Sequence, residues 1–180
     1  MLYADYTASG KSLAFIEDYI RENVLPMYGN THTTVSATGR QSTYFRQEAR
    51  QIIRNGVNAS ERDAVLFSGN GVTGAIAHLA RALYLEQYMA HSKGPAVVIT
   101  GPQEHHSNML VWRESGADVV QIGEDQFGAI DVKGLEQQLK NYSDRPLVIG
   151  SFSAASNITG ILTDTDTVTV LLHKYNALSF

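Results

Sequence analysis

The sequence predicts a three-layer α/β/α domain built around a mainly parallel sheet. Short apolar runs alternate with stretches of helical periodicity, and several of the runs end in glycine or in polar residues. Apolar runs that are separated by amphipathic helices are typical of βαβ units, in which helices cover both faces of a parallel sheet. A chain of 180 residues is long enough to bury such a core. We therefore expect one α/β domain.

Two helices joined by a loop are predicted before the first strand. Apolar residues recur every three or four positions over residues 12–24, and Pro26 closes this stretch. Residues 28–40 are rich in threonine, serine and glycine without a period, so we expect an ordered loop there. The helical period returns over residues 42–57, with the apolar residues on one face.

The predicted sheet comes from short apolar runs in the remaining sequence. Four runs have the length and composition of strands, namely residues 64–67, 96–100, 118–122 and 147–152. Stretches with helical period predict helices over residues 72–89, 109–114, 131–142 and 164–176. Residues 177–180 have the pattern of one more strand at its beginning. We therefore interpret the sequence as a fragment of a longer chain.

Composition and charge disfavour several classes of protein. The net charge of -4 and the pI near 5.8 do not give the basic surface that nucleic acid requires. No apolar stretch reaches the roughly 18 residues that span a membrane, and the amino end lacks the pattern of a signal peptide. There is no cysteine, so neither a disulfide scaffold nor a thiol nucleophile is expected within these residues. We expect a cytoplasmic protein that binds neither nucleic acid nor membrane.

A glycine-rich turn over residues 69–74 lies between a predicted strand and a predicted helix. Backbone amides in such a turn can approach an anion at the positive end of the helix, and phosphate is the natural ligand. The hydroxyl of Thr73 could add a further donor. The alternative is a turn that only packs the helix on the strand.

Glu104, His105 and His106 come directly after the run 96–100. Ligands of open parallel sheets bind at the carboxyl ends of the strands. An imidazole there can stack on a heteroaromatic ring, the glutamate and histidine could bind a metal, or the histidine could be structural. In an extended segment the two imidazoles would face opposite sides, so one would enter the site. The other four histidines lack the spacing of metal ligands, and we expect no metal.

Asn157 follows the run 147–152, which places it at the same edge of the predicted sheet. Its amide can donate to or accept from a phenolic oxygen, although asparagine is also a common turn residue. Phosphate donors, an aromatic stacker and an amide at three strand ends form a more specific combination than any of the three alone.

The order of these segments resembles the class V aminotransferase family, the pyridoxal-phosphate enzymes that include cysteine desulfurases. The similarity covers almost the entire chain. Glu-His-His-Ser-Asn at 104–108, with Trp112 after it, is similar to the family's Glu-His-His-Ala-Asn and tryptophan, and Ser-Asn-Ile-Thr-Gly at 156–160 is similar to its Ser-Asn-x-x-Gly. Residues 3–9 resemble the family's Tyr-Leu-Asp-Asn-Ala-Ala-Thr segment, residues 28–32 its Gly-Asn-Pro-His stretch near the substrate entrance, and residues 67–80 its phosphate loop and helix.

The resemblance implies the large domain of a fold-type I PLP-dependent transferase. Residues 1–40 would then be an amino-terminal helix and substrate-side loop, and residues 41–180 a partial PLP-binding large domain. The cofactor would be pyridoxal 5'-phosphate, with Gly71, Val72 and Thr73 around its phosphate, His105 stacked on its ring as the catalytic histidine, and Asn157 at its ring hydroxyl. The substrate side would be formed by Thr7, Ala8, Ser9, Asn30 and His32.

The sequence departs from the family pattern at a few positions. Val72 stands where the family has a hydroxyl residue, Gly74 where it has glutamate, and Tyr6 where it has asparagine. The family's aspartate, which pairs with the pyridinium nitrogen, and its Schiff-base lysine would both follow Phe180. We therefore expect the full-length protein to be an enzyme and this piece to be inactive. The resemblance also implies an amino-acid substrate and a homodimer.

Two functions of other classes also fit the residues. One is a noncatalytic α/β module that binds a phosphorylated ligand through residues 69–73. The other is a metal-dependent hydrolase that uses the His105 loop. A lysine in a Ser-x-His-Lys-type stretch after Phe180 would favour the enzyme over both.

Overall fold

The computed structural model describes residues 2–4 and 6–180 and divides into two compact units between Phe67 and Ser68. Met1 and Asp5 lie outside the described residues, and Asp5 is one position of the segment 3–9 that resembles the family. The expected division at residues 40 and 41 falls inside a continuous helix, α2 (Ala37–Gly56). That division concerns the larger domain and stays a prediction.

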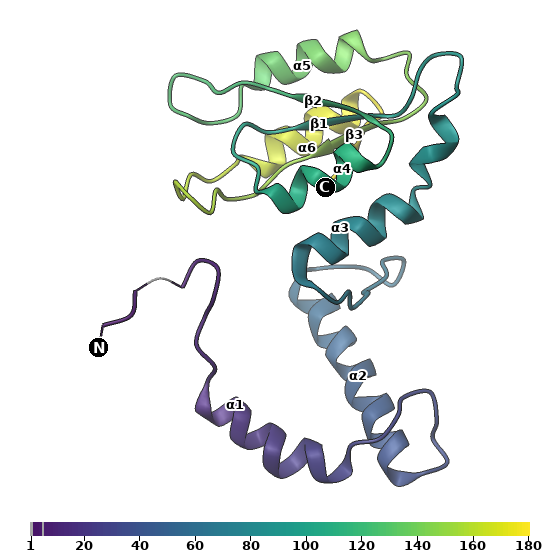
Figure 1. Ribbon diagram of the computed structural model, residues 1–180, viewed down its shortest axis with the longest axis vertical. Coiled ribbons are helices and arrows are strands. Elements are labelled where there is room, and N and C mark those ends of the chain that lie inside the picture. The colour runs from purple at the N-terminus through teal and green to yellow at the C-terminus, as the bar shows by residue number, and fades with distance from the viewer. Residues whose placement is uncertain (1, 5) are drawn as a thin grey trace. The chain divides into compact units, whose positions relative to one another are not determined.

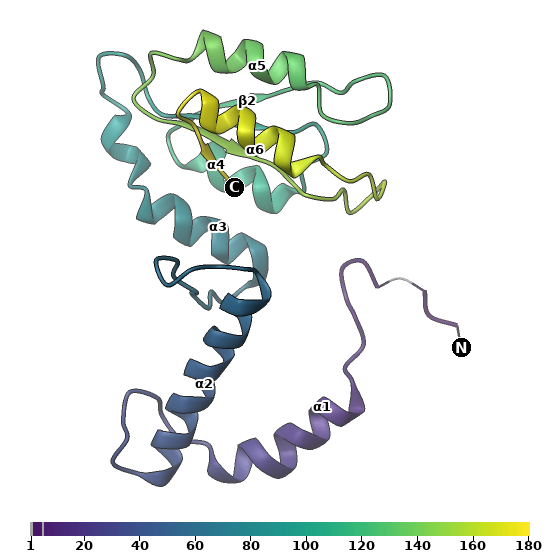
Figure 2. The same ribbon diagram turned by 180° about the vertical axis from the view of Figure 1, so that it is seen from behind.

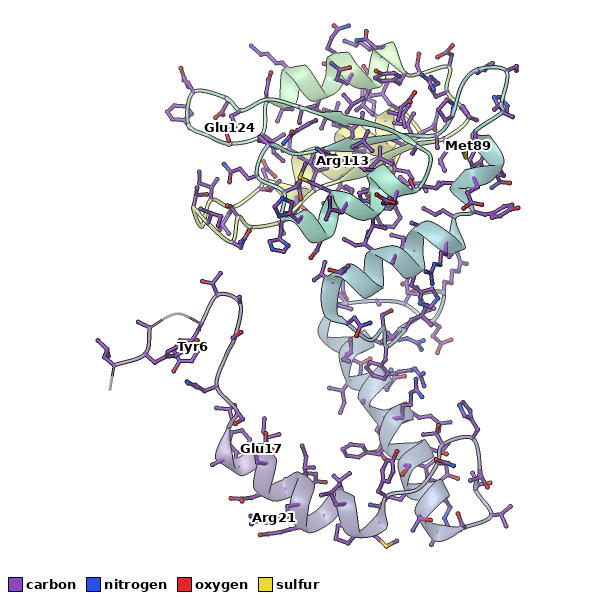
Figure 3. All side chains as sticks on the ribbon, viewed as in Figure 1. Tyr6, Glu17, Arg21, Met89, Arg113 and Glu124 are labelled. Carbon is purple, nitrogen blue, oxygen red and sulfur yellow. The ribbon has the colours of Figure 1, made fainter. Side chains whose placement is uncertain are left out.

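The amino-terminal unit is helical, with longer helical segments than the sequence indicated. A short helix α1 (Ala14–Tyr19) continues into the π turn η1 (Ile20–Val24) and the 3-10 turn η2 (Leu25–Met27), so Pro26 lies inside the last turn and not beyond it. Arg21, which is labelled in Figure 3, pairs with two neighbouring carboxylates on this surface.

Helix α2 begins five residues earlier than expected, at Ala37. The hydroxyl of Ser36 caps it by accepting from the backbone N–H of Gly39 at 3.1 Å. Serine is a favoured N-cap residue because its oxygen satisfies one of the free amides of the first turn. The first turns of α2 are polar, which hides their helical period in the sequence.

The predicted strand at residues 64–67 is wrong. The segment pairs with no other strand among the residues that the structure describes, and its Leu66 and Phe67 side chains are 64% and 44% exposed. Instead, Arg50 donates to the carbonyl of Val65 at 3.2 Å and its guanidinium lies over the Phe67 ring. An apolar run becomes a strand only where a neighbouring strand supplies hydrogen bonds, and none does so here.

The carboxyl-terminal unit contains the sheet. Its strands are β1 (Val97–Thr100), β2 (Asp118–Gln121), β3 (Val148–Ser151) and β4 (Leu178–Ser179), in the order β2-β1-β3-β4. All three pairings are parallel, with Thr100 opposite both Gln121 and Ser151. The expected mainly parallel sheet is confirmed. The strand expected to begin at residues 177–180 is confirmed as well, because β4 pairs with β3. β1 and β3 are buried along their whole length, which explains their continuous apolar sequences.

Helices cover both faces of this sheet, so the three-layer prediction is confirmed. Helices α5 (Val132–Asn141) and α6 (Thr165–Lys174) pack on one face around Leu135 and Leu172. Figure 1 shows α5 along one side of the strands, and Figure 2, from behind, shows α6 against them. Helices α3 (Gly71–Ala82) and α4 (Leu110–Glu114) and the 3-10 turn η3 (Leu85–Tyr88) contribute to the core of the other face, around Trp112.

The helix expected over residues 72–89 is interrupted. α3 ends at Ala82, and Tyr84 adopts a left-handed conformation with φ of 48° before the chain continues into η3. Helical period alone did not reveal this break, because leucine, tyrosine and methionine on either side of it keep the apolar spacing. Among the helices of the described residues, none is long and apolar enough to cross a membrane.

Candidate functional site

Three segments of the carboxyl-terminal unit form the candidate site. One is the start of α3, the second is the loop after β1 with the 3-10 turn η4 (His106–Asn108), and the third is the loop after β3. The two loops begin at adjacent parallel strands, so both leave the sheet at its carboxyl edge. This is the edge at which open parallel sheets bind ligands.

The start of α3 presents free backbone amides. Asn70 and Gly71 both have positive φ, 61° and 62°, and this turn leads directly into the helix. The first hydrogen bond of the helix is made by the N–H of Gly74, which donates to the Asn70 carbonyl at 3.3 Å. The amides of Gly71, Val72 and Thr73 therefore belong to the first turn, where helix geometry provides no acceptor. Such a terminus attracts anions.

The glycines of this turn differ in how much room surrounds their backbone. A Cβ added at Gly69 or Gly71 would meet no atom within 4 Å, so the backbone is open on that side. A Cβ at Gly74, in contrast, would collide with the carbonyl oxygen of Gly69. This close approach of the turn to the helix explains why glycine stands at position 74, where the family has glutamate.

A chain of hydrogen bonds joins the start of α3 to His105. The hydroxyl of Thr73 lies 2.8 Å from the Ser107 hydroxyl, which lies 3.0 Å from Nδ1 of His105. The backbone N–H of Ser107 donates to the same Nδ1 at 3.2 Å. Because a backbone amide can only donate, Nδ1 is the acceptor in this bond. These bonds hold the ring in one orientation beside the helix start.

His105 and Asn157 line the same surface depression, which has a volume of about 320 Å³. Both side chains are exposed to solvent. The Asn157 turn is held by the hydroxyl of Ser156, which accepts from the backbone N–H of Thr159 at 3.1 Å. The structure thus brings the predicted cofactor residues of both loops into one place. Thr73 is linked to His105 through its hydroxyl bond to Ser107, and Gly71 and Val72 precede it in the same first turn of α3.

His106 also lines this depression, contrary to the expectation that the two imidazoles face opposite sides. The ring centroids of His105 and His106 are 6.2 Å apart, with the planes at 67°. The reason is that the chain turns at this point, since His106 begins η4 and is not part of an extended segment. Alternation of side chains holds only for extended backbone.

The predicted substrate-side residues all belong to the amino-terminal unit. Thr7, Ala8 and Ser9 are exposed, and the Ser9 carbonyl accepts from the Tyr3 hydroxyl at 3.0 Å. Asn30 is exposed, and so is His32, whose φ is 69°. Their substrate role stays a prediction.

A buried polar network behind the site was not predicted. The Glu104 carboxylate accepts from the backbone N–H of Ser153 at 2.9 Å, from its hydroxyl at 2.6 Å, and from the Asn108 amide at 2.7 Å. The Ser151 hydroxyl donates to Asn108 Oδ1 at 2.6 Å, and the fully buried indole N–H of Trp112 donates to the same oxygen at 3.1 Å. The four-residue spacing of 104, 108 and 112 is visible in the sequence, but their partners on β3 are not.

Metal binding finds no support in the geometry. Among residues 2–4 and 6–180, no group of three or more histidine, aspartate and glutamate side chains is arranged to hold an ion. Zinc sites of hydrolases use three protein ligands, so the hydrolase alternative has no ligand set within the described part of the chain.

The fold and the site are those of a parallel α/β protein with its polar loops at the carboxyl edge of the sheet. The chain belongs to the class-V aminotransferase family, whose model matches residues 2–180. It is 28% identical to a probable cysteine desulfurase of Halalkalibacterium halodurans, over 99% of this chain and 43% of the relative. It is 30% identical to a cysteine desulfurase of Synechococcus elongatus, over 82% of this chain and 23% of the relative.

Solved structures show the same fold. A NifS-like protein from Rickettsia africae superposes with a TM-score of 0.80 at 18% identity, covering 99% of this chain and 46% of that protein. The cysteine desulfurase CsdA of Escherichia coli superposes with a TM-score of 0.62 at 22% identity, covering 84% of this chain and 37% of that protein. The chain thus spans less than half the length of these relatives.

Proposed function

We propose that this chain is the pyridoxal-phosphate-binding portion of an enzyme that acts on an amino acid, and that it needs further residues for catalysis. The observation that carries the proposal is the hydrogen-bonded chain from Thr73 through Ser107 to His105. It joins an anion-binding helix start to a planar imidazole with a fixed orientation. Asn157 lines the same depression as that imidazole.

The residues present fit this cofactor. The free amides of Gly71, Val72 and Thr73 suit its phosphate, and no atom stands where a Cβ of Gly71 would be. The planar His105 ring is exposed and suits stacking on a pyridine ring. The Asn157 amide suits the ring hydroxyl, because an amide can both donate and accept. When bound, this cofactor supplies an electron sink for a carbanion at the substrate.

Catalysis by this cofactor requires a lysine, and none of the lysines lines the depression. Lys174 lies on α6, and a hydrogen bond to the Glu136 carboxylate raises the pKa of its ammonium group. A nucleophilic lysine needs a lowered pKa, so Lys174 is unsuited to the task. We therefore propose that the catalytic lysine comes from residues beyond these 180 and that the chain by itself is inactive.

Relatives with the name cysteine desulfurase suggest cysteine as the substrate class. The sequence has no cysteine, so a desulfurase of this kind would take its nucleophilic thiol from elsewhere. Aminotransferase and lyase reactions use the same cofactor and are distinguished by their products. A homodimer and a cytoplasmic location stay predictions from the sequence and the family resemblance.

One observation favours a second candidate. The amides at the start of α3 would also bind the phosphate of a ligand without a pyridine ring, as in a noncatalytic α/β module. The two candidates differ at His105 and Asn157, which only the cofactor proposal requires.

The test is made on the complete protein that the gene encodes. Pyridoxal phosphate should give it a visible absorbance band, and reduction with borohydride should attach the cofactor to a lysine outside residues 1–180. His105→Ala and Asn157→Ala should weaken cofactor binding, whereas His91→Ala, at an exposed turn outside the depression, should not. An open reading frame without a further lysine, or a protein that takes up no cofactor, would refute the enzyme proposal. Binding of simple phosphate esters alone would favour the noncatalytic module.

A further inference from the structure

We propose that Glu104 is a positioning residue that holds the His105 loop and the Asn157 loop in a fixed relation to each other. Glu104, Asn108, Ser151 and Ser153 are called the Glu104 clamp below. The consequence of this role, that His105 and Asn157 are placed on one ligand, rests on the proposed function. The clamp itself is a property of the chain and is tested separately.

The carboxylate of Glu104 bridges two loops that are far apart in the sequence. Its oxygens accept from the Ser153 backbone N–H at 2.9 and 3.1 Å, from the Ser153 hydroxyl at 2.6 Å, and from the Asn108 amide at 2.7 Å. All of these groups are donors, and an ionised carboxylate is the one side chain of this size that offers only acceptors. Hydrogen bonds to an ionised group are shorter and about twice as strong as neutral ones.

Both bridged loops lead directly to a site residue. Glu104 immediately precedes His105, and Ser153 lies four residues before Asn157. A second bond runs in parallel, since the Thr159 hydroxyl donates to the side-chain oxygen of Gln103 at 3.0 Å. Among the described residues, no hydrogen bond joins His105 to Asn157, so their relative position depends on these bridges.

The clamp is anchored in the core. The Asn108 amide donates to the Ser151 carbonyl at 3.2 Å as well as to Glu104, and its oxygen accepts from the buried Trp112 indole. Asn108 and Ser151 are almost fully buried. Gly101 keeps the space for the carboxylate, because a Cβ at that position would lie 2.7 Å from Glu104 Oε1. The loops are therefore fixed to β3 and not only to each other.

Replacement by the amide tests the bridge, because an exposed glutamate outside such a network tolerates the same change. Glu104→Gln keeps the size but turns an NH₂ group toward donors on Ser153 or Asn108, which leaves at least one donor without a partner. The loops would then lose their fixed relation while the helices and strands remain. Glu124→Gln is the matched control, because Glu124 is exposed, follows β2 and is labelled in Figure 3.

The first measurement needs no cofactor. Hydrogen–deuterium exchange of the complete protein should rise at least about tenfold in residues 153–163 for Glu104→Gln, although the substitution is 49 residues away in the sequence from Ser153. Glu124→Gln should leave that exchange unchanged. Ser153→Ala removes only the hydroxyl donor and should give a smaller rise, so the clamp can be assessed even if Glu104→Gln fails to fold. Unchanged exchange in Ser153→Ala and in a folded Glu104→Gln would overturn the proposal.

The second measurement is pyridoxal-phosphate affinity together with the circular dichroism of the bound cofactor. Glu104→Gln should bind about tenfold more weakly, the equivalent of one lost hydrogen bond, and should change the dichroism band, because His105 and Asn157 would no longer keep their relative position. Glu124→Gln should match the wild type in both. If the wild type binds no cofactor, the proposed function fails while the exchange result still decides the clamp. Changed exchange with unchanged affinity and dichroism would overturn the positioning role.

Discussion

Removal of the Asn108 side chain should destabilise the carboxyl-terminal unit. Its side chain makes four hydrogen bonds: the amide donates to Glu104 and to the Ser151 carbonyl, and the oxygen accepts from Trp112 and from the Ser151 hydroxyl. It is 8% exposed. Asn108→Ala removes all four bonds and leaves a small void in the core.

The magnitude follows from what each partner retains. Trp112 and the Ser151 hydroxyl keep the bond between them at 3.1 Å, and Glu104 keeps both donors of Ser153, whereas the Ser151 carbonyl loses the Asn108 amide. At about 1 kcal/mol for each neutral bond and somewhat more for the charged one, we expect a loss of about 3 to 5 kcal/mol in the free energy of unfolding.

Trp112 provides the assay, because it is the one tryptophan of these 180 residues and lies in this network, and a Trp112→Phe variant gives the signal of any tryptophan elsewhere in the complete protein. Urea denaturation of the complete protein, followed by tryptophan fluorescence, should show a lower midpoint for Asn108→Ala. The control is Asn141→Ala at the exposed end of α5, where only a Gln137 bond is lost and a change within about 0.5 kcal/mol is expected. A loss below about 1 kcal/mol for Asn108→Ala would show that the network does not stabilise the unit.

Three other expectations use the same protein. Gly150→Ala should lower the free energy of unfolding by about 1 to 3 kcal/mol in the same fluorescence assay, because the new Cβ would lie 2.5 Å from both terminal methyl groups of Leu172; unchanged stability would contradict the close packing of α6 on β3. The Thr167 backbone N–H and hydroxyl hold the pKa of the Asp164 carboxyl below its ordinary value of 3.8. Asp164 therefore stabilises the folded state above that value and loses this contribution as the pH falls through the lowered pKa, so Asp164→Asn should flatten the acid side of the stability profile, and an identical profile would count against it. Thr73→Val should weaken pyridoxal-phosphate binding about tenfold in a fluorescence titration, because it removes one hydroxyl bond at the helix start, and equal affinity would exclude that role.

The sheet could be predicted from the sequence because its strands are buried on both faces. Continuous apolar runs at residues 96–100 and 147–152 leave few other interpretations between helical stretches. The run at 64–67 has the same composition, yet it forms no strand, because pairing depends on a neighbour that is distant in the sequence. The early start of α2 at Ala37 depends on the cap by Ser36, and the break after α3 depends on the left-handed conformation of Tyr84. Hydrophobic periodicity does not predict the conformation of a single residue.

The candidate site was predictable to the extent that its residues are adjacent in the sequence. The turn 69–74, the pair His105 and His106, and Asn157 each stand directly after an apolar run or in a glycine turn. The Glu104 clamp was not predictable, because the hydrogen bonds of Glu104 depend on Ser153, which is 49 positions away in the sequence. Hydrogen bonds of this kind form only once β1 and β3 pair, so no local sequence pattern predicts them.

The two units differ in how many of their residues are buried, and this difference decides which of the predicted site residues are supported by a packed core. The carboxyl-terminal unit has a core on each face of its sheet, and the predicted cofactor residues lie on loops next to that core. In the amino-terminal unit Gly39 is the one residue that is buried among those described, and Ile52 on the apolar face of α2 is 71% exposed. Apolar faces of this kind are stabilised by contacts that the unit does not make within itself. The predicted cofactor residues therefore have the support of a packed core within their own unit, whereas the predicted substrate residues Thr7, Ala8 and Ser9 have no comparable core among the described residues of theirs.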